Sequence, residues 1–302
     1  MKIIVFDDDP TGSQTVHDCL LLLNWDYQTL LKGLKSKSKL LFILCNTRSL
    51  SEKELNNRLS SICNNLCEVI NNEGFKNEHF IFVSRGDSTL RGHNFLEPII
   101  INKFLGPFDA TFHIPAFIEG KRLTIKGNHF VEEIPAHKTI FAKDKIFGFE
   151  TNNLKKLIFQ KSKFKLRLDK IKNLYTSELD LLEINEENQV FKKIKDLKDN
   201  TQVIVDAENY FYLNKFSTLV KKLKCEKKFL FRSAASFISS ISKIEKNNKD
   251  NNYYSRLRRK NNANEFMKGL IVFGSHVDIS TVQLKYLLKI PSCKGIEIDV
   301  NE

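Results

Sequence analysis

Short apolar runs alternate with amphipathic segments along most of the chain, and this alternation limits the fold more than any other feature. The runs that we interpret as strands are Ile3–Phe6, Cys19–Leu23, Leu40–Cys45, Phe80–Ser84, Ala110–Ile114, Thr201–Ala207 and Lys228–Phe231. Continuous apolar runs of this length are typical of strands that are buried on both faces, as in a parallel sheet.

The segment between the third and fourth runs predicts a long helix. Its start, Ser51-Glu52-Lys53-Glu54, is a capping box, in which the side chains of Ser51 and Glu54 satisfy each other's backbone amides. Apolar residues follow at helical spacing (Leu55, Leu59, Ile62, Leu66, Val69 and Ile70). A helix that joins two buried strands indicates a parallel crossover, so we predict an α/β fold with a mostly parallel sheet and crossover helices. Ser217–Leu223 is interpreted as part of a later helix.

Two further segments change the pattern. Gly120–Glu133 alternates in polarity around Lys126-Gly127-Asn128, which predicts a β-hairpin insertion. Residues 244–266 are polar and rich in asparagine, which predicts a linker after an N-terminal domain of residues 1–243.

Residues 267–302 then start afresh with a strand, a Gly274-Ser275 turn and a helix, and Gly295–Val300 is a possible last strand. A segment this short cannot easily close a core, so it predicts an incomplete second α/β domain.

Charge and composition exclude several classes of protein. The net charge of +12 is spread over the whole chain and is not gathered into a basic segment with a nucleic-acid-binding signature, so no nucleic-acid partner is predicted. No apolar run reaches the roughly 20 residues that span a bilayer, so no membrane partner is predicted either. Six cysteines without a CxxC pair indicate free thiols in a reducing compartment. The N-terminus lacks the pattern of a signal peptide, and we expect a cytoplasmic protein.

Four polar clusters follow predicted strands. They are Asp7-Asp8-Asp9-Pro10-Thr11-Gly12, Asn46-Thr47-Arg48-Ser49, the stretch Ser84–His93, and Pro115-Ala116-Phe117 with Glu119 and Arg122. Ligands of open α/β sheets gather at the carboxyl ends of the strands. We therefore expect the four clusters to meet in one pocket.

The side chains of these clusters suit a small polyhydroxy acid. Ser88 and Thr89 could bind an anion at a helix start, and Arg91 and Arg122 could hold a carboxylate in bidentate fashion. Asp8 or Asp9 could orient hydroxyl groups and accept a proton.

Simpler structural roles stay open for some of these residues. Asp87 could be a helix cap, and Arg48 could form a surface ion pair. The histidines His93, His113 and His129 lack the spacing of metal ligands, and no metal site is predicted.

The opening motif also allows a phosphatase. The pattern Asp7-x-Asp9-x-Thr11 after an apolar strand resembles the first motif of haloacid-dehalogenase-like phosphatases, in which the first aspartate is a nucleophile and the second an acid/base. Thr47 could imitate their second motif. A later acidic pair that would hold magnesium is not evident.

A longer resemblance covers essentially the whole chain. The sequence resembles the four-carbon acid sugar kinase family, a former family of unknown function called DUF1537. The matching segments are Asp8-Asp9-Pro10-Thr11-Gly12, the Asp-Ser-Thr-Leu-Arg-Gly stretch Asp87–Gly92, Pro115-Ala116-Phe117 with Gly120 and Arg122, Phe231–Phe237, and Val272–Leu284. The stretch Asp87–Gly92 is the most specific of them.

The resemblance implies ATP-dependent phosphorylation of a tetronate-type sugar acid, with ATP and Mg²⁺ as cofactors. It implies that Asp8 and Asp9 are catalytic. The substrate-binding residues that it implies are Thr11, Gly12, Arg48, Asp87, Ser88, Thr89, Arg91 and Arg122. Gly274 and Ser275 would belong to the nucleotide site, most of which would lie beyond residue 302. We therefore expect a chain that supplies mainly the sugar-acid-binding part, with a separate chain as a possible partner; the alternative is a non-catalytic, sugar-acid-binding remnant.

Overall fold

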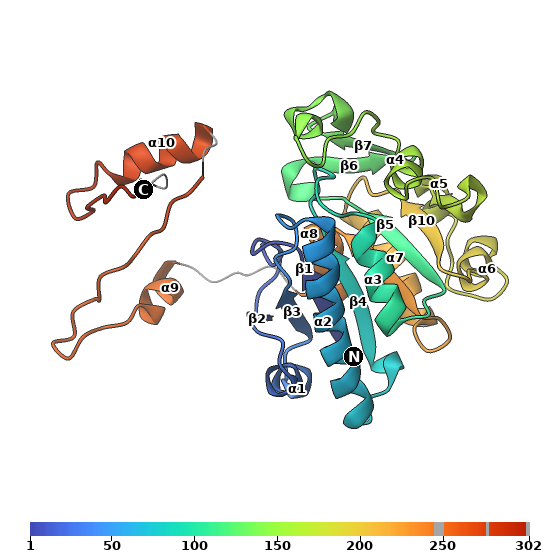
Figure 1. Ribbon diagram of the computed structural model, residues 1–302, viewed down its shortest axis with the longest axis horizontal. Coiled ribbons are helices and arrows are strands. Elements are labelled where there is room, and N and C mark those ends of the chain that lie inside the picture. Colours follow the sequence, from blue (N-terminus) through green and yellow to red (C-terminus); the bar gives the residue numbers. More distant parts are fainter. Residues whose placement is uncertain (245–250, 276–277, 300–302) are drawn as a thin grey trace. The chain divides into compact units, whose positions relative to one another are not determined.

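The chain divides into two units, Met1–Lys246 and Asn247–Glu302, which are described separately. The computed structural model describes residues 1–244, 251–275 and 278–299 (Figure 1). None of the helices in these ranges is long and apolar enough to cross a membrane.

An eight-stranded sheet forms the centre of the N-terminal unit, and all its neighbouring strands are parallel. In spatial order the strands are β2 (Leu20–Leu22), β3 (Leu40–Leu44), β1 (Lys2–Asp7), β4 (Phe80–Arg85), β11 (Phe229–Ser233), β5 (Ala110–Ile114), β10 (Thr201–Val205) and β9 (Ile171–Leu174). The predicted α/β fold with a parallel sheet is therefore confirmed. Only the edge strand β9 was not predicted, because its sequence Ile-Lys-Asn-Leu carries little apolar signal.

Helices cover both faces of this sheet. They are α1 (Tyr27–Lys35), α2 (Glu52–Asn72), α3 (Leu96–Leu105), α4 (Leu154–Lys161), α5 (Thr176–Asp180), α6 (Gln189–Lys195), α7 (Tyr210–Leu223) and α8 (Ala235–Ser242). The capping box at the start of α2 is present, with Ser51 accepting from the Glu54 amide and Glu54 accepting from the Ser51 amide.

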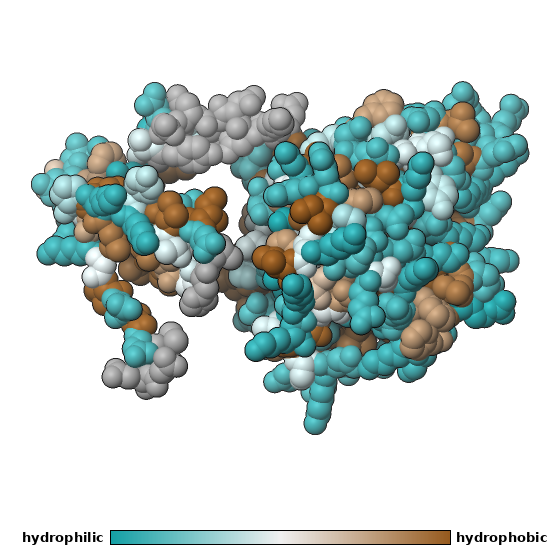
Figure 2. Space-filling view, turned by 90° about the horizontal axis from the view of Figure 1, so that it is seen from above, coloured by the Kyte–Doolittle hydropathy of each residue, from teal (hydrophilic) through white to brown (hydrophobic). Residues whose placement is uncertain are grey.

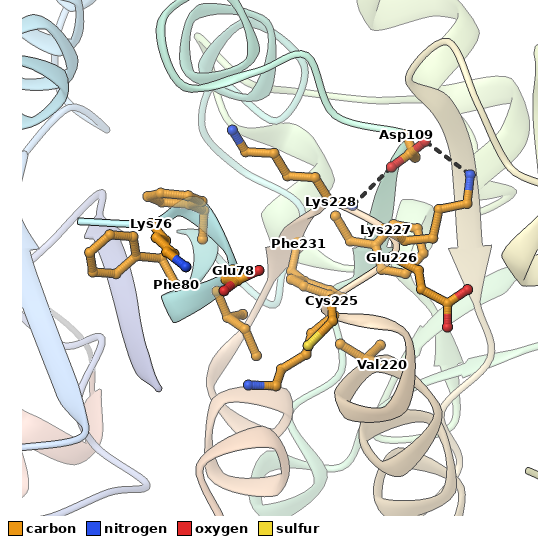
Figure 3. A pocket seen from close by; sticks show the side chains of 14 residues that line it. Lys76, Glu78, Phe80, Asp109, Val220, Cys225, Glu226, Lys227, Lys228 and Phe231 are labelled. Carbon is orange, nitrogen blue, oxygen red and sulfur yellow. Dashed lines mark hydrogen bonds and ion pairs between the residues drawn. The ribbon is translucent and has the colours of Figure 1, made fainter. Parts of the chain in front are cut away.

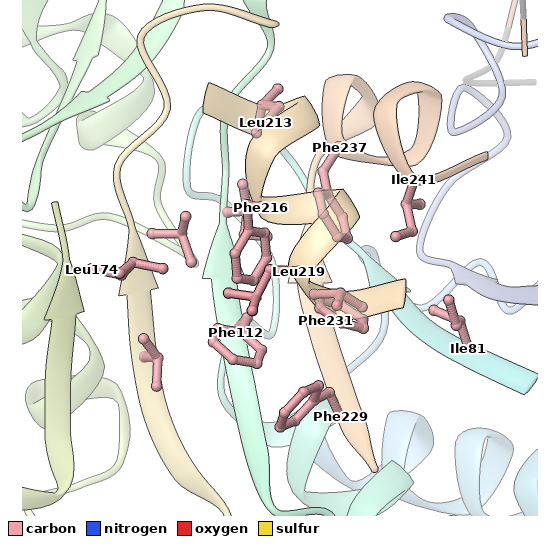
Figure 4. Close-up of a cluster of buried hydrophobic side chains, with 14 of the residues drawn as sticks. Ile81, Phe112, Leu174, Leu213, Phe216, Leu219, Phe229, Phe231, Phe237 and Ile241 are labelled. Atoms are coloured by element: carbon pink, nitrogen blue, oxygen red, sulfur yellow. The ribbon is translucent and has the colours of Figure 1, made fainter. Parts of the chain in front are cut away.

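Alternate side chains of the strands feed two separate cores. On one face Ile4, Phe6 and Phe82 pack with residues of α1, α2 and α3. On the other face Phe112, Phe229 and Phe231 pack with Phe216 of α7 and Phe237 of α8 (Figure 4). Burial on both faces fixes the register of the strands, because a slip by one residue would exchange the two sets of side chains.

The predicted hairpin insertion is a small antiparallel sheet of β6 (Arg122–Ile125), β7 (Asn128–Val131) and β8 (Ile134–Pro135). A bridge between Thr124 and Ala207 joins it to the segment after β10. The carboxylate of Asp206 accepts the backbone amides of Lys126 at 2.7 Å and Gly127 at 2.8 Å at the hairpin turn. These contacts hold the hairpin at the carboxyl edge of the parallel sheet.

The C-terminal unit contains α9 (Asn251–Leu257) and α10 (Asp278–Leu287). The predicted helix is confirmed by α10, but residues 269–273 and 294–299 have no strand, so the two strands predicted there are wrong for the residues that are described. Val300 lies outside them. Apolar side chains stay in solvent, with Leu270, Val272 and Ile296 at least 87% exposed. Figure 2 shows apolar side chains, in brown, among the hydrophilic ones on the surface of the chain. The residues of this unit that the structure describes bury no core that could hold strands in place.

Candidate functional site

The predicted clusters meet at the carboxyl edge of the parallel sheet. Strands β3, β1, β4 and β11 are neighbours, and they end at Leu44, Asp7, Arg85 and Ser233. Strand β1 pairs with β3 on one side and with β4 on the other. The chain thus builds the sheet outward in one direction up to β3 and in the opposite direction from β4, so the strand order reverses at β1. Such a reversal of strand order opens a crevice at the carboxyl ends of an α/β sheet, which is the usual place for a ligand.

Asp8 and Asp9 are held by two arginines. Asp8 is fully buried, and it accepts hydrogen bonds from Arg48 Nη2 at 2.8 Å, from Arg48 Nε at 3.1 Å and from Arg85 Nη1 at 3.1 Å. Asp9 accepts from Arg85 Nη1 at 3.0 Å, from the Thr11 hydroxyl at 2.5 Å, and from Arg48 Nη1. Burial would raise the pKa of Asp9, but the Thr11 hydroxyl and the two guanidinium groups outweigh it and lower this pKa.

Asp7 lies deeper and has a different character. Its side chain is 1% exposed, its Oδ1 has no hydrogen-bond partner among the described residues, and Arg85 Nη1 is 3.6 Å away. Burial, against the opposing charge of Arg85, raises the pKa of Asp7 to about 7. A Cβ atom on Gly12 would lie 2.2 Å from the Asp7 carboxylate, so only glycine fits above this aspartate.

A buried ion pair supports these residues from below. Arg232 on β11 donates from Nη1 to Glu97 on α3 and to Ser84 Oγ at 2.7 Å, and from Nη2 to Asn94 Oδ1 at 3.0 Å. Glu97 also accepts from the Thr47 hydroxyl at 2.7 Å. Glu97 and Arg232 are 2% and 4% exposed, so the pair joins three strand ends and a helix out of contact with water.

The loop Asp87–Gly92 folds around the Asp87 carboxylate. Asp87 accepts from the Thr89 amide at 3.0 Å, from the Thr89 hydroxyl at 2.5 Å, and from Arg91 Nε at 2.7 Å. Leu90 and Gly92 have positive φ values of 67° and 95°. Asp87 therefore organises a turn. Burial would raise the pKa of its carboxylate, but Arg48, Thr89 and Arg91 outweigh burial and lower this pKa.

Arg122, at the start of the hairpin, faces the same loop. Its Nη1 donates to Ser88 Oγ at 3.1 Å, its guanidinium lies 5.4 Å from the Phe117 ring centre and 5.9 Å from that of Phe141, and Arg91 lies 5.2 Å from Phe141. Arg122 Nε is buried and has no partner among the described residues. Burial, with Arg91 as a further like charge, lowers the pKa of Arg122, although Asp87 opposes this effect.

His129 on β7 joins the hairpin to the loop. It is fully buried, Nε2 lies 2.7 Å from the Ser88 carbonyl oxygen, and Nδ1 lies 3.0 Å from the Thr124 hydroxyl. Burial lowers the pKa of His129 to about 4, so the ring is neutral near pH 7. It donates to the carbonyl through Nε2 and accepts through Nδ1, which agrees with the structural role that the sequence suggested.

The structure brings the predicted residues of the N-terminal unit together and specifies their contacts. The predicted residues that lie in this constellation are Asp8, Asp9, Thr11, Gly12, Arg48, Asp87, Ser88, Thr89, Arg91 and Arg122. Sequence reasoning missed Glu97 and Arg232 as members of the site, and it included Arg85 in the stretch Ser84–His93 without giving it a role. Arg85 and Arg232 were detectable in principle, because each is a charge at the end of an otherwise apolar strand. Arg48 is an ion-pair partner, as its simpler interpretation had it, although the pair is mostly buried.

The predicted nucleotide-site residues have no comparable surroundings. Gly274 and Ser275 are exposed in an irregular segment, and nothing described lies within 4 Å of the Cβ position of Gly274. Backbone that cradles a triphosphate needs converging amides and a cation. The described residues of the C-terminal unit therefore do not fit ATP and Mg²⁺ by themselves.

Comparison with known structures supports the fold. A DUF1537 protein from Bordetella bronchiseptica, solved with bound citrate as a domain-swapped dimer, has a TM-score of 0.60 and 16% sequence identity over 80% of this chain and 56% of its own. A DUF1537 protein from Haemophilus influenzae has a TM-score of 0.60 and 16% identity over 82% of this chain and 57% of its own. This chain thus spans little more than half the length of these structures. No curated protein matches it in sequence.

A family model identifies the N-terminal unit directly. The model, described as a sugar-binding N-terminal domain, matches residues 3–241, which include all of β1 except Lys2, all of β11, and the site residues from Asp7 to Arg232. The match covers most of the chain, and it agrees with the resemblance that Asp8–Gly12 and Asp87–Gly92 indicated. The chain therefore belongs to the four-carbon acid sugar kinase (DUF1537) family and carries its sugar-binding N-terminal domain.

Proposed function

We propose that this chain binds a small sugar acid at the carboxyl edge of its parallel sheet and supplies the substrate-binding part of an ATP-dependent sugar-acid kinase. One observation carries the proposal: Arg122 keeps a buried Nε donor that has no partner among the described residues, next to Arg91 and above Ser88. A buried guanidinium donor without an acceptor is costly, and a ligand carboxylate would satisfy it.

The charges around this position favour an acidic ligand. Arg122 has no carboxylate within ion-pair distance among the described residues. The nearby carboxylate of Asp87 is paired with Arg91 and also interacts with the positive charge of Arg48. Phe117 and Phe141 exclude water from one side of the two guanidinium groups, which strengthens a charge-assisted contact. The citrate in the Bordetella structure is likewise a hydroxy acid.

Asp9 is the carboxylate best placed to meet the hydroxyl groups of such a ligand. Its side chain is 17% exposed, whereas Asp8 is fully buried and Asp7 lies beneath Gly12. The lowered pKa of Asp9 makes it a good hydrogen-bond acceptor and a weak base. We therefore assign Asp9 to orienting a substrate hydroxyl, and Asp8 with Arg48 and Arg85 to positioning Asp9.

A phosphatase with Asp7 as nucleophile is less compatible with this geometry. A nucleophile must reach the phosphorus atom, and Asp7 is 1% exposed, with Gly12 packed against its carboxylate. Phosphoryl transfer to a sugar acid needs a nucleotide site, which would come from residues other than those described here. We propose a further polypeptide segment or chain as its source.

Calorimetry of the full chain against four-carbon sugar acids tests the proposal. We expect binding, a loss of about 1.5–3 kcal/mol with Arg122→Ala, and no change with Arg167→Ala, which removes an arginine of an exposed ion pair with Asp169. Absence of binding to any tetronate, or equal affinity of the Arg122→Ala and unmodified chains, would refute it. A chain that phosphorylates a tetronate with Mg-ATP unaided would show that the nucleotide site has been misplaced.

A further inference from the structure

A cavity lies at the opposite edge of the parallel sheet. It has a volume of about 330 Å³ and lies at the amino ends of β4, β11 and β5. Since β4 runs from Phe80 to Arg85, the length of a strand separates this cavity from the site with Arg85. The volume is within the range of about 300–1,000 Å³ that is usual for small-molecule sites.

The cavity exists because two neighbouring strands part. Hydrogen-bonded pairing between β4 and β11 starts at Phe82 and Leu230. Strand β4 nevertheless begins two residues earlier, at Phe80, and β11 begins at Phe229, which pairs with Ala110 of β5 on its other side. The opening between the strands brings the edges of both apolar cores to one cavity. The apolar residues that form its floor are each at most 8% exposed: Phe80, Ile81, Phe82, Val220, Phe229 and Phe231.

Lysines surround this apolar floor. Figure 3 shows Lys76, Glu78 and Phe80 on one side of the cavity and Val220, Cys225 and Glu226 on the other. The lysines of the lining are Lys76, Lys224, Lys227 and Lys228, and its acids are Glu78, Asp109 and Glu226.

Internal pairing leaves a positive excess. Lys227 donates to Asp109 at 3.0 Å, and Glu226 pairs with Lys195, outside the cavity, at 2.9 Å. Among the described residues, Lys76, Lys224 and Lys228 have no carboxylate within ion-pair distance, and Glu78 is the one remaining acid of the lining. Lys228 lies 5.3 Å from the Phe108 ring centre. Lys221 follows the lining residue Val220, and burial together with the charges of Lys243 and Lys39 lowers its pKa to about 8.

We infer that this cavity binds a small amphipathic monoanion, namely a carboxylate with an apolar body, at a site separate from the sugar-acid site. The apolar body packs against the phenylalanine floor between β4 and β11, and the carboxylate meets the ammonium groups of Lys76 and Lys224 at the mouth. Glu78 disfavours ligands of higher charge, because a second anionic group would lie close to its carboxylate. The polyhydroxy ligand proposed for the carboxyl edge lacks the apolar body that this floor requires.

Alkylation of Cys225 provides the measurement, because this exposed thiol lines the cavity. The full chain is treated with iodoacetamide in the presence of hexanoate, hexan-1-ol or inorganic phosphate, and modification of each cysteine is followed by peptide mass spectrometry. We expect hexanoate to slow the alkylation of Cys225 in a saturable manner, and the alcohol and phosphate to have much weaker effects. Cys293, in the other unit, is the internal reference and keeps its rate.

Two substitutions test the role of charge. Lys224→Gln should raise the hexanoate concentration needed for half-maximal protection by about threefold, which corresponds to the loss of one partly solvated ion pair between ligand and protein. Lys198→Gln removes an exposed lysine outside the cavity and should leave it unchanged. Each variant should unfold on heating at the same temperature as the unmodified chain, which shows that it is folded. The inference is overturned if hexanoate gives no saturable protection, if hexanol or phosphate protects equally, or if the two lysine variants behave alike.

Discussion

Arg48 donates two hydrogen bonds to the carboxylate of Asp8, from Nη2 at 2.8 Å and from Nε at 3.1 Å. The same bidentate geometry occurs between Arg167 and Asp169, where both distances are 3.0 Å. The surroundings differ: Asp8 is fully buried, whereas the side chains of Arg167 and Asp169 are 78% and 59% exposed. Burial, and not geometry, should therefore decide what each pair contributes to stability.

This contrast gives the first prediction. Arg48→Ala should lower the free energy of unfolding by about 3 kcal/mol, because it leaves a buried carboxylate short of a partner. Arg167→Ala should change it by less than about 1 kcal/mol, because water replaces the lost contact. Urea unfolding of both variants measures the difference. Equal effects would mean that Arg85 alone can neutralise Asp8.

The second prediction concerns Gly12. Gly12→Ala would place a Cβ atom 2.2 Å from the Asp7 carboxylate, and it should destabilise the fold by about 1–3 kcal/mol through overpacking. Adding Asp7→Ala should recover part of this loss, since the smaller side chain makes room, and the two substitutions should be clearly non-additive. Gly269→Ala is the matched control, because nothing described lies within 4 Å of its Cβ position. Strict additivity of Gly12→Ala and Asp7→Ala would show that the loop moves away from Asp7.

The third prediction concerns pH. Asp7 has a pKa of about 7 in the folded chain against an ordinary value of 3.8. Between these values the folded state holds a proton that the unfolded state releases, so the contribution of Asp7 to stability is complete below about pH 4 and is lost as the pH rises through about 7. Asp7→Asn mimics the protonated acid and should gain stability relative to the unmodified chain as the pH rises over this range.

Urea midpoints of both proteins from about pH 5 to about pH 8 measure this linkage. Asp169→Asn, at an exposed ion pair, is the control and should run nearly parallel to the unmodified chain. Asp206, whose pKa burial raises to about 6, contributes in the same direction in every protein compared, so it cancels in the difference. A constant difference between Asp7→Asn and the unmodified chain would contradict a raised pKa for Asp7.

The sequence predicted well those parts of the fold that depend on interactions between residues close together in the chain. The strand Ile3–Phe6 and the capping box Ser51–Glu54 depend on neighbours within a few residues, and both are confirmed. The meeting of the clusters around Asp9 and Arg48 followed from one topological rule, that parallel strands end at the same edge. The C-terminal strand predicted near Leu270 is wrong because an apolar run forms a strand only when a neighbouring strand pairs with it.

The pairing of charges within the site was beyond sequence reasoning. Arg232 meets Glu97 across 135 positions of sequence, and Arg85 meets Asp8 across 77. Each arginine could have paired with any of several acids of the chain, and only the packed geometry selects one. For the same reason, the sequence suggested Arg48 as a ligand contact, whereas the structure shows its guanidinium occupied by Asp8 and Asp9.

The last prediction concerns the buried pair of Glu97 and Arg232. Glu97→Leu should destabilise the chain by about 3–5 kcal/mol, because it leaves the guanidinium of Arg232 buried with only neutral partners and the distant carboxylate of Asp8, 4.0 Å away. Arg232→Leu should be similarly costly.

The double variant should be less destabilised than the sum of the two, since it removes both charges from the interior together. Because Ser84 and Thr47 also donate to Glu97, the double variant should still fall short of the unmodified chain. Urea unfolding gives the four free energies of this cycle, and calorimetry with a tetronate reports whether the pair also affects ligand binding through Asp8, which positions Asp9. A double variant as unstable as the sum of the single ones would mean that Glu97 and Arg232 contribute independently, through their neutral partners, and not as an ion pair.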